Sequence, residues 1–297
     1  MKHIVGFSGG IDSQACAGMV LDKFGAEDTI LLNSDAGGHE DPLTTGFVAW
    51  YSVKVHPIVN CPAIVGDIWE QDGYLEIAAA KDTKIGHKLR EMAYQNQNQN
   101  LSFGEMIKLK GRPPSRSNQF CTEILKLRPL RRWMKQAFGP LGQYAGQDFV
   151  RYAGVRRDES KKRANTPDSA WDDFFDCEVF YPVAAWTKVQ CFDFVKSRGE
   201  EFNPLYMLGF NRVGCAPCIN SGKEDILNWV LRRPTMIDKI RKMEAEAGCT
   251  FFPPMVAGTH HNTIDEVIAW AKTDYGGRQF RMIPEPVSCS SKYGLCE

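Results

Sequence analysis

Short apolar runs alternate with longer amphipathic segments in the first part of the chain. The runs HIVGFS (residues 3–8) and DTILLNSD (28–35) have the pattern of buried strands, and SVKVHPIV (52–59) is a third, shorter candidate. Between the first two lies DSQACAGMVLDKFG (12–25), which has helical periodicity and a glycine at its end. Strands separated by helix-length segments predict β-α-β units and a parallel sheet.

The same alternation continues further along the chain. The basic, proline-containing stretch LKGRPPSRSNQF (109–120) predicts an exposed loop, and CTEILKLRPLRRWMKQAF (121–138) predicts a helix. The segment DFVRYAGVRRDES (148–160) predicts a buried strand that runs into a polar loop. Two further helices are predicted at KVQCFDFVKSRG (188–199) and KEDILNWVLRR (223–233).

These patterns together predict the architecture. We expect an α/β fold with a doubly wound, mainly parallel sheet in a nucleotide-binding core over residues 1–180. Past Tyr181 the chain is richer in aromatic residues, cysteine and proline. Residues 181–297 are therefore expected to form a helical C-terminal subdomain with a C-x-x-C motif and a cysteine-containing tail.

The composition is that of a globular protein. Of 297 residues, 43% are hydrophobic and 24% are charged, which excludes the disordered class. No apolar run reaches the roughly 20 residues of a membrane helix, and no secretory signal is visible, so we expect a cytoplasmic location and no membrane partner. Ten cysteines in that compartment favour metal ligation or redox chemistry over a disulfide framework.

The formal net charge is zero, but the charges are unevenly placed. Residues 108–135 contain nine Lys or Arg and one acid, and residues 151–163 contain six bases against two acids. Residues 168–178 then hold five carboxylates and no base. Such runs are either solvated faces of the fold or, for the two basic blocks, the binding surface of a phosphate-rich ligand.

The strand-to-helix turn SGGIDS (8–13) is a candidate anion site. Backbone N–H groups at a helix N-terminus point at a ligand, and the helix dipole favours negative charge there. Gly9 and Gly10 let the backbone approach closely, and Ser8 and Ser13 carry hydroxyl donors. The turn lacks the Gly-Lys-Ser/Thr ending of a Walker A loop and the third glycine of a dinucleotide fingerprint. An ordinary strand-to-helix turn is the alternative.

Residues 8–13 match the SGGxDS loop of the PP-loop ATP pyrophosphatases, in the adenine nucleotide alpha hydrolase-like superfamily. The resemblance implies that Ser8, Gly9, Gly10, Asp12 and Ser13 bind the terminal phosphates of ATP, which is cleaved between its α and β phosphates. It also implies that Asp12 helps to bind Mg²⁺, since a carboxylate beside phosphates calls for a bridging cation.

Further stretches are similar to one branch of that superfamily, the phosphoadenosine phosphosulfate reductase-like proteins. AGVRRDES (153–160) resembles their arginine loop, which makes Arg156 and Arg157 expected catalytic donors to phosphate oxygens. CTEILKLRPL (121–130) and NPLYMLGFNRVGCAPCI (203–219) resemble two more family segments. By the same resemblance Lys126 contacts the nucleotide, as does Asp35, which follows the second strand.

Cys215 and Cys218 form C-A-P-C, a spacing that lets two thiolates share one metal centre, although a redox pair or a zinc half-site has the same spacing. In adenylyl-sulfate reductases a similar pair joins a tandem Cys-Cys to hold a [4Fe-4S] cluster. Here Cys121 matches the first tandem position and Thr122 stands at the second.

The resemblance therefore supplies three ligands of four, and the tail supplies the candidates for the fourth. Cys289 is the expected ligand, because Cys296 is the penultimate residue and chain ends fray. Structural Zn²⁺ fits a four-cysteine set equally well, and buried thiols without a metal are the third possibility.

The tail also bears on the reaction. In KYGLCE (292–297), Tyr293 stands where reductases of this branch carry the cysteine that attacks sulfur, and a phenol cannot form a thiosulfonate. Those reductases bind an already cleaved nucleotide and tend to have a degraded loop, whereas this loop is intact. The resemblance thus favours ATP cleavage over sulfate reduction.

An intact loop combined with an iron–sulfur site most resembles the ATP pyrophosphatase component of DNA phosphorothioation systems. This implies activation of a nucleic-acid phosphate, in DNA rather than tRNA, for sulfur insertion. The implied partners are a cysteine desulfurase or another sulfur donor and the proteins of a modification complex. The alternatives are a phosphoadenosine phosphosulfate or adenylyl-sulfate reductase, and a non-catalytic nucleotide-binding assembly module.

Overall fold

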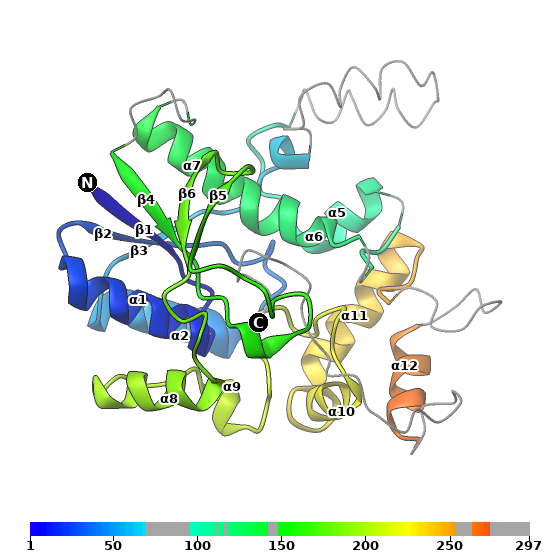
Figure 1. Ribbon diagram of the computed structural model, residues 1–297. Helices are drawn as coiled ribbons and strands as arrows, with labels where there is room; N and C mark the ends of the chain where they lie inside the picture. Colours follow the sequence, from blue (N-terminus) through cyan, green and yellow to red (C-terminus); the bar gives the residue numbers. More distant parts are fainter. Residues whose placement is uncertain are drawn as a thin grey trace.

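A six-stranded sheet runs through the N-terminal part of the molecule, with strand order β3-β2-β1-β4-β6-β5 (Figure 1). Every neighbouring pair is parallel except β5 and β6. The computed structural model describes residues 1–68, 96–110, 112–115, 118–139, 141, 148–252 and 263–273. The strands are β1 Lys2–Gly6, β2 Thr29–Asn33, β3 Ile58–Asn60, β4 Phe149–Tyr152, β5 Ser169–Asp172 and β6 Cys177–Phe180.

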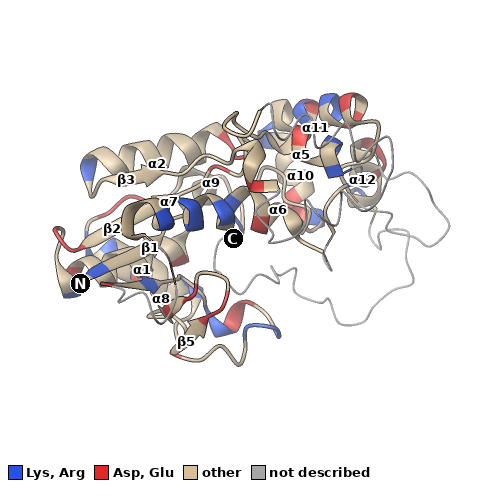
Figure 2. Ribbon diagram, turned by 90° about the horizontal axis from the view of Figure 1, so that it is seen from above, with Lys and Arg blue, Asp and Glu red and all other residues tan. Residues whose placement is uncertain are grey.

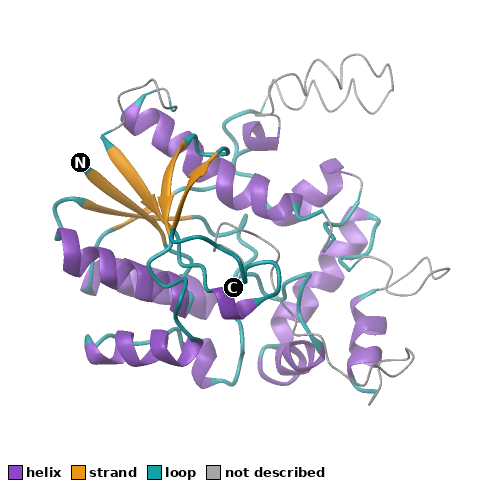
Figure 3. Cartoon of the chain, viewed as in Figure 1, coloured by secondary structure: helices purple, strands orange, loops and turns teal. Residues whose placement is uncertain are grey.

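Helices cover both faces of this sheet, as a doubly wound fold requires (Figure 3). Because side chains alternate along a strand, Val5 and Leu31 face one side and Ile4 and Leu32 the other. The first face packs against α1 (Ile11–Phe24) and α2 (Pro42–Lys54). The second packs against α7 (Arg128–Phe138). The predicted α/β fold with a mainly parallel sheet is confirmed.

The prediction of a strand over residues 52–59 is wrong for its first half. Residues 52–54 close α2, and only Ile58–Asn60 pair with β2. Helix α2 was not predicted. At its N-terminus Asp41 accepts a hydrogen bond from Leu43 N–H, and Pro42 occupies its first position. Val53, in the segment predicted as a strand, lies in the last turn of this helix.

The expected helix over residues 121–138 is continuous but not uniform. It consists of α6 (Phe120–Thr122), a π-helical turn η2 (Glu123–Leu127) and α7, and ends at Gly139 with φ 82°. The predicted loop before it starts later than expected, because helix α5 (Phe103–Lys110) continues into it. A π-turn inserts one extra residue into the helix and is frequently found at functional sites.

Seven more elements complete the described part of the chain. Both helices predicted after residue 181 are present. These elements are η3 (Arg157–Glu159), α8 (Lys188–Ser197), α9 (Pro204–Met207), α10 (Lys223–Arg232), α11 (Pro234–Ala247) and α12 (Ile264–Ala271), and a short 3₁₀ turn, η1, spans Val65–Ile68. Within the described ranges, no helix combines the length and the apolarity needed to cross a membrane.

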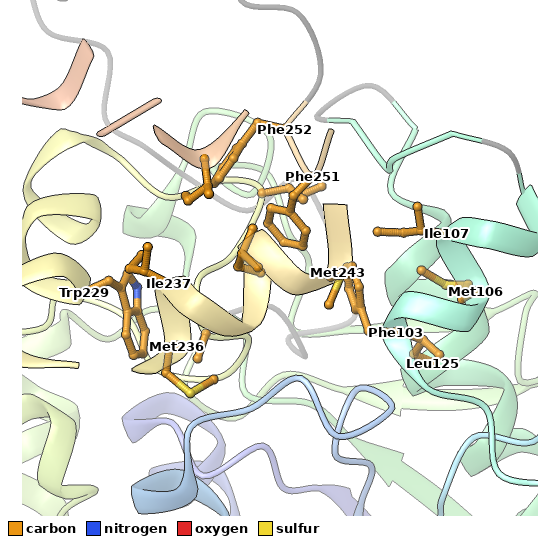
Figure 4. Close-up of a cluster of buried hydrophobic side chains, with 14 of the residues drawn as sticks. Phe103, Met106, Ile107, Leu125, Trp229, Met236, Ile237, Met243, Phe251 and Phe252 are labelled. Atoms are coloured by element: carbon orange, nitrogen blue, oxygen red, sulfur yellow. The ribbon is translucent and has the colours of Figure 1, made fainter. Parts of the chain in front are cut away.

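The largest hydrophobic cluster joins the two halves of the chain. In Figure 4, Phe103 and Met106 of α5 face Met243 of α11 and Phe251, while Trp229 of α10 lies at the other end of the cluster. Helix α8, in contrast, packs against α1 of the sheet region. The proposed boundary near residue 180 coincides with the end of β6 and stays a prediction.

The strand order fixes where a ligand can bind. From β1 the chain first adds strands on one side and later returns to add β4 on the other. The carboxyl ends of β1 and β4 therefore lie side by side at the switch point, where α/β sheets bind their ligands. Gly154, just past β4, lies so close to the turn after β1 that an added Cβ would stand 2.5 Å from the carbonyl oxygen of Asp12.

Substitution Gly154→Ala is therefore expected to lower the free energy of unfolding by about 1–3 kcal/mol, because the atoms in the way belong to a backbone that cannot rotate aside. Gly46→Ala is the matched control. Gly46 is exposed within α2 and has open space around its Cβ position, so alanine there should stabilise by about 0.5–1 kcal/mol. Urea unfolding of both variants measures the difference, and a Gly154→Ala protein as stable as wild type would contradict the close approach.

Candidate functional site

Two serine hydroxyls hold the turn of residues 8–13 in shape. The Ser13 hydroxyl donates to the carbonyl oxygen of Gly10 at 2.8 Å and accepts from the backbone N–H of Ser8 at 3.1 Å. Since its own proton goes to a carbonyl, the 3.1 Å contact between the two hydroxyls has Ser8 as donor. Gly9 has φ 79°, a conformation that glycine adopts without strain. The serines expected to contact a ligand thus brace the turn.

Two residues from a distant segment support the turn from outside. The Asn203 side chain is fully buried and donates to the carbonyl oxygen of Gly9 at 3.2 Å and to the Thr44 hydroxyl at 3.1 Å. The Tyr206 hydroxyl accepts a hydrogen bond from Ile11 N–H at 2.9 Å. Neither was singled out individually by sequence analysis, although both lie in the segment 203–219 that carries a family resemblance.

Asp12 and Arg156 meet at the centre of the site. The Asp12 carboxylate has no exposed surface, and its Oδ2 lies 2.6 Å from Nε of Arg156, a residue that also contacts Asp158. Neither carboxylate oxygen of Asp12 makes a well-oriented hydrogen bond to any described residue. A buried carboxylate in this condition is suited to bind a Mg²⁺ ion shared with phosphate oxygens. The structure therefore brings together two of the predicted catalytic residues.

A pocket of about 220 Å³ opens at this point. It lies at the N-terminus of α1, where backbone N–H groups and the helix dipole attract anions. Asp12 and Arg156 were expected in it; the other charged and aromatic residues at its wall were not. The pocket is lined by Asp12, Arg156, Glu159, Lys188, Tyr206 and Arg212, among others.

Arg157 lies outside this pocket, although it adjoins Arg156 in the sequence. Its Nε donates to the carbonyl oxygen of Thr166 at 2.7 Å, and its Nη2 lies 2.5 Å from the Asp168 carboxylate. It therefore fastens the loop that follows β4.

Lys126 and Asp35 lie at a second position, beyond β2. Lys126 is buried, with its Nζ 3.5 Å from Oε1 of Glu40. Burial raises the pKa of Glu40 to about 7, with the charge of Lys126 acting in the opposite direction. The Asp35 carboxylate accepts a hydrogen bond from Gly37 N–H at 3.1 Å. Lys126 contributes to a different cavity from that of Asp12.

Three of the four predicted cysteine ligands line that second cavity. Cys121, Cys215 and Cys218 surround a space of about 20 Å³, together with Lys126 and Asn220. No three His, Cys, Asp or Glu side chains among the described residues are close enough to hold a single metal ion. Thiolates on separate irons of a cluster need not converge on one ion, so the donor chemistry fits a cysteine-bound cluster. Cys289 and Cys296 lie outside the described residues.

Residues 33–41 attach this cavity to the sheet. Ala216 N–H donates to the carbonyl oxygen of His39 at 2.9 Å, and Nε2 of His39 lies 3.0 Å from the carbonyl oxygen of Pro217. A carbonyl only accepts, so the proton of the His39 ring is on Nε2. Burial lowers the pKa of His39 to about 3, which keeps the ring neutral. The C-x-x-C motif is thus held by the loop that leaves β2.

Much of the basic charge noted in the sequence is paired within the fold. Arg151 contacts Asp172, Arg157 contacts Asp168, and the wholly buried Arg163 contacts Glu159. In the block before β4, Arg128 and Arg132 contact Glu123 and Asp67. In Figure 2, basic residues (blue) and acidic residues (red) both occur along the described part of the chain. Residues 168–178 supply acids to the second basic block.

Comparison with known proteins supports one family. Residues 80–221, slightly less than half of the chain, match the phosphoadenosine phosphosulfate reductase domain. This match supports the similarity of the chain to the phosphoadenosine phosphosulfate reductase-like superfamily. The matched region of this reductase-like chain includes Arg156 and the cysteine cavity, whereas the turn of residues 8–13 lies before it.

Among its relatives, the reductase-like chain is 26% identical over 332 residues to the uncharacterized 37.8 kDa protein in the gpa 5′ region of Escherichia phage 186, covering 99% of this chain and 96% of that protein. It is 40% identical over 65 residues to the adenosine 5′-phosphosulfate reductase of Mycolicibacterium smegmatis, covering 22% of this chain and 28% of the reductase. With the corresponding reductase of Allochromatium vinosum it shares 31% identity over 102 residues, which are 34% and 36% of the two chains. The chain thus spans about a third of the length of these two reductases.

Among solved structures, the phosphoadenylyl-sulfate reductase of Candida auris in complex with phosphate aligns with a TM-score of 0.41 and 13% identity, over 72% of this chain and 81% of that chain.

Proposed function

We propose that this reductase-like chain is an ATP pyrophosphatase, which cleaves ATP between its α and β phosphates and transfers AMP to an acceptor. One observation carries the proposal: a fully buried Asp12 carboxylate and the Arg156 guanidinium meet at the N-terminus of α1, at the mouth of an anion-sized pocket. That arrangement suits the terminal phosphates of a nucleotide.

The chain's own groups would act on the leaving group. An acceptor oxygen attacks the α phosphorus, the bond from that phosphorus to the bridging oxygen breaks, and pyrophosphate leaves with the electron pair. The N–H groups at the start of α1 and the Arg156 guanidinium stabilise the negative charge that develops on pyrophosphate. Asp12 would hold Mg²⁺, which when bound supplies further neutralisation of phosphate charge.

The acceptor in this proposal is a nucleic-acid phosphate, in DNA rather than tRNA. Adenylation would make a non-bridging oxygen a leaving group, to be replaced by sulfur from a cysteine desulfurase or another donor within a modification complex. The support is the resemblance of the intact turn to that of phosphorothioation enzymes, together with exposed Lys161 and Lys162 just beyond Glu159 at the pocket.

A cysteine-bound centre belongs to the same proposal. Cys121, Cys215 and Cys218 line one cavity, and with Cys289 they would bind a [4Fe-4S] cluster, with Zn²⁺ as the alternative metal. Such a centre would support the C-x-x-C loop that packs against residues 33–41.

Sulfate reduction is the second candidate function. Adenosine 5′-phosphosulfate reductases are similar to the chain over 65 and 102 residues, and a sulfate group could occupy the same pocket as a phosphate. The Tyr293 substitution that argues against it lies outside the described residues.

Incubation of the protein with Mg²⁺ and ATP labelled at the α phosphate should release labelled AMP and pyrophosphate. Asp12→Asn should lower this rate at least about 100-fold, since it removes the charge at the buried centre of the site. Asp22→Asn, on the same helix but in an exposed ion pair with Arg198, should keep the wild-type rate. Sulfite release from adenosine 5′-phosphosulfate without ATP cleavage would instead establish the reductase, and ATP binding without turnover a nucleotide-binding assembly module.

Protein purified without oxygen is expected to contain iron and sulfide, or zinc if that alternative holds. Cys121→Ala, Cys215→Ala and Cys218→Ala should each reduce the bound metal strongly, because each removes a thiolate from the same cavity. Cys249→Ala, at a partly exposed cysteine outside the cavity lining, is the control and should retain it. Elemental analysis and the visible absorption spectrum measure both, and metal-free wild-type protein would refute the proposed centre.

A further inference from the structure

The pocket at Asp12 has a second wall, formed by a segment far along the chain. Lys188 begins α8, Tyr206 lies in α9, and Arg212 follows α9. The Lys188 amino group contacts the carbonyl oxygen of Asn211 and stands 5.2 Å from the centre of the Tyr206 ring. Lys188, Tyr206 and Arg212, here named the 188–212 wall, line the same pocket as Asp12 and Arg156.

The charges of the first wall are already occupied. Arg156 contacts the carboxylates of both Asp12 and Asp158, and Glu159 contacts Arg163. The charge of Arg156 is therefore partly balanced by those carboxylates before a ligand binds. The pocket acquires its further positive charge from Lys188 and Arg212 of the 188–212 wall.

A buried acidic residue, Asp225, is also near these two cations. It lies in the first turn of α10 and does not line the pocket. Burial raises the pKa of Asp225, and the charges of Arg212 and Lys188 oppose that rise, so the three groups are near one another. Lys188 and Arg212, unlike Asp225, line the pocket itself.

The pocket's size and its backbone groups also limit the ligand. A volume of about 220 Å³ is smaller than the roughly 300–1,000 Å³ of clefts that hold whole drug-sized ligands, so the pocket suits one end of a nucleotide. Ile11 and Tyr206 both line the pocket, and the Ile11 N–H at the start of α1 donates a hydrogen bond to the Tyr206 hydroxyl. This amide therefore already binds an oxygen atom in the pocket. The fully buried Asp12 carboxylate, which is paired with Arg156 but accepts no well-oriented hydrogen bond from a described residue, lines the same space.

We propose that Lys188 and Arg212 determine which anion this pocket accepts, and that they select the terminal diphosphate of a nucleoside triphosphate over the terminal sulfate group of a phosphosulfate. That sulfate group carries a single negative charge and would be served by the N-terminal amides and Arg156, whereas a diphosphate carries several charges and requires the added cations. This inference rests on the proposed function, because it names the residues that would bind the pyrophosphate released from ATP.

Binding of inorganic pyrophosphate with Mg²⁺ to the full chain, measured by calorimetry, tests the inference without any need for turnover. Lys188→Gln and Arg212→Gln should each weaken binding at least about tenfold, since each removes one charge-assisted hydrogen bond. Lys188→Arg and Arg212→Lys, which keep the charge, should recover most of the affinity. The controls are Lys196→Gln on the same helix and Arg232→Gln on α10, both exposed, and they should stay within about twofold of wild type.

The outcomes separate this inference from the proposed function. Wild type that cleaves ATP, together with Gln variants that bind pyrophosphate as tightly as wild type, would overturn the role of Lys188 and Arg212 alone. Wild type that binds adenosine 5′-phosphosulfate but neither ATP nor pyrophosphate would overturn both. Melting temperatures of the Gln variants close to that of wild type show that a loss of affinity is not a loss of folding, and the charge-conserving variants give an independent answer if a Gln variant unfolds.

Discussion

The close contact between the backbones of Gly154 and Asp12 is the constraint on which the site depends. Parallel strands β1 and β4 pair directly, so the turns that leave them must pass each other at one edge of the sheet. Only a residue without a side chain allows this passage, and the result is that Arg156, two residues later, reaches the buried Asp12 carboxylate. The contact between Asp12 and Arg156 places both side chains in the wall of the pocket at the N-terminus of α1.

Described segments from further along the chain support the contact between Asp12 and Arg156. Asn203 and Tyr206 bond to the turn after β1, and α8 packs on the helix that the turn begins. On the other side, residues 33–41 connect β2 to the C-x-x-C loop through the neutral ring of His39. The pocket at Asp12 and the cysteine cavity are therefore attached to neighbouring strands of one sheet.

Sequence patterns predicted correctly those features that depend on neighbouring residues alone. The strand-turn-helix of residues 3–25, the strand before Gly154 and the pair Cys215 and Cys218 could be read because glycine placement and periodicity determine them. The strand expected at residues 52–59 was half wrong because the helix-starting pair Asp41 and Pro42 outweighs a short alternation of valines. The edge strand β5 and its neighbour β6 carry no long apolar run and were not predicted.

Residues placed by tertiary packing were beyond sequence analysis. Arg156 and Arg157 are equivalent as letters, yet only Arg156 lines the pocket, while Arg157 binds Thr166 and Asp168. Lys188 and Arg212 reach the pocket only because the segment that carries them folds back against α1, and no local pattern distinguishes them from surface cations. Several cations of the basic blocks, which suggested a polyanion surface, pair with acids instead. Arg132, Arg151 and Arg157 pair with acids elsewhere in the sequence, and Arg128 and Arg163 pair with acids of their own block.

If ATP is cleaved in this protein, the two phosphates that leave should be bound by the turn of residues 8–13. An experimental structure of the full chain with Mg²⁺ and α,β-methylene-ATP, which cannot be cleaved at that position, would locate them. We expect the β and γ phosphates at the N-terminus of α1, beside Arg156, with the metal on Asp12. An analogue bound with those phosphates in solvent and only its α phosphate at the turn would contradict this expectation.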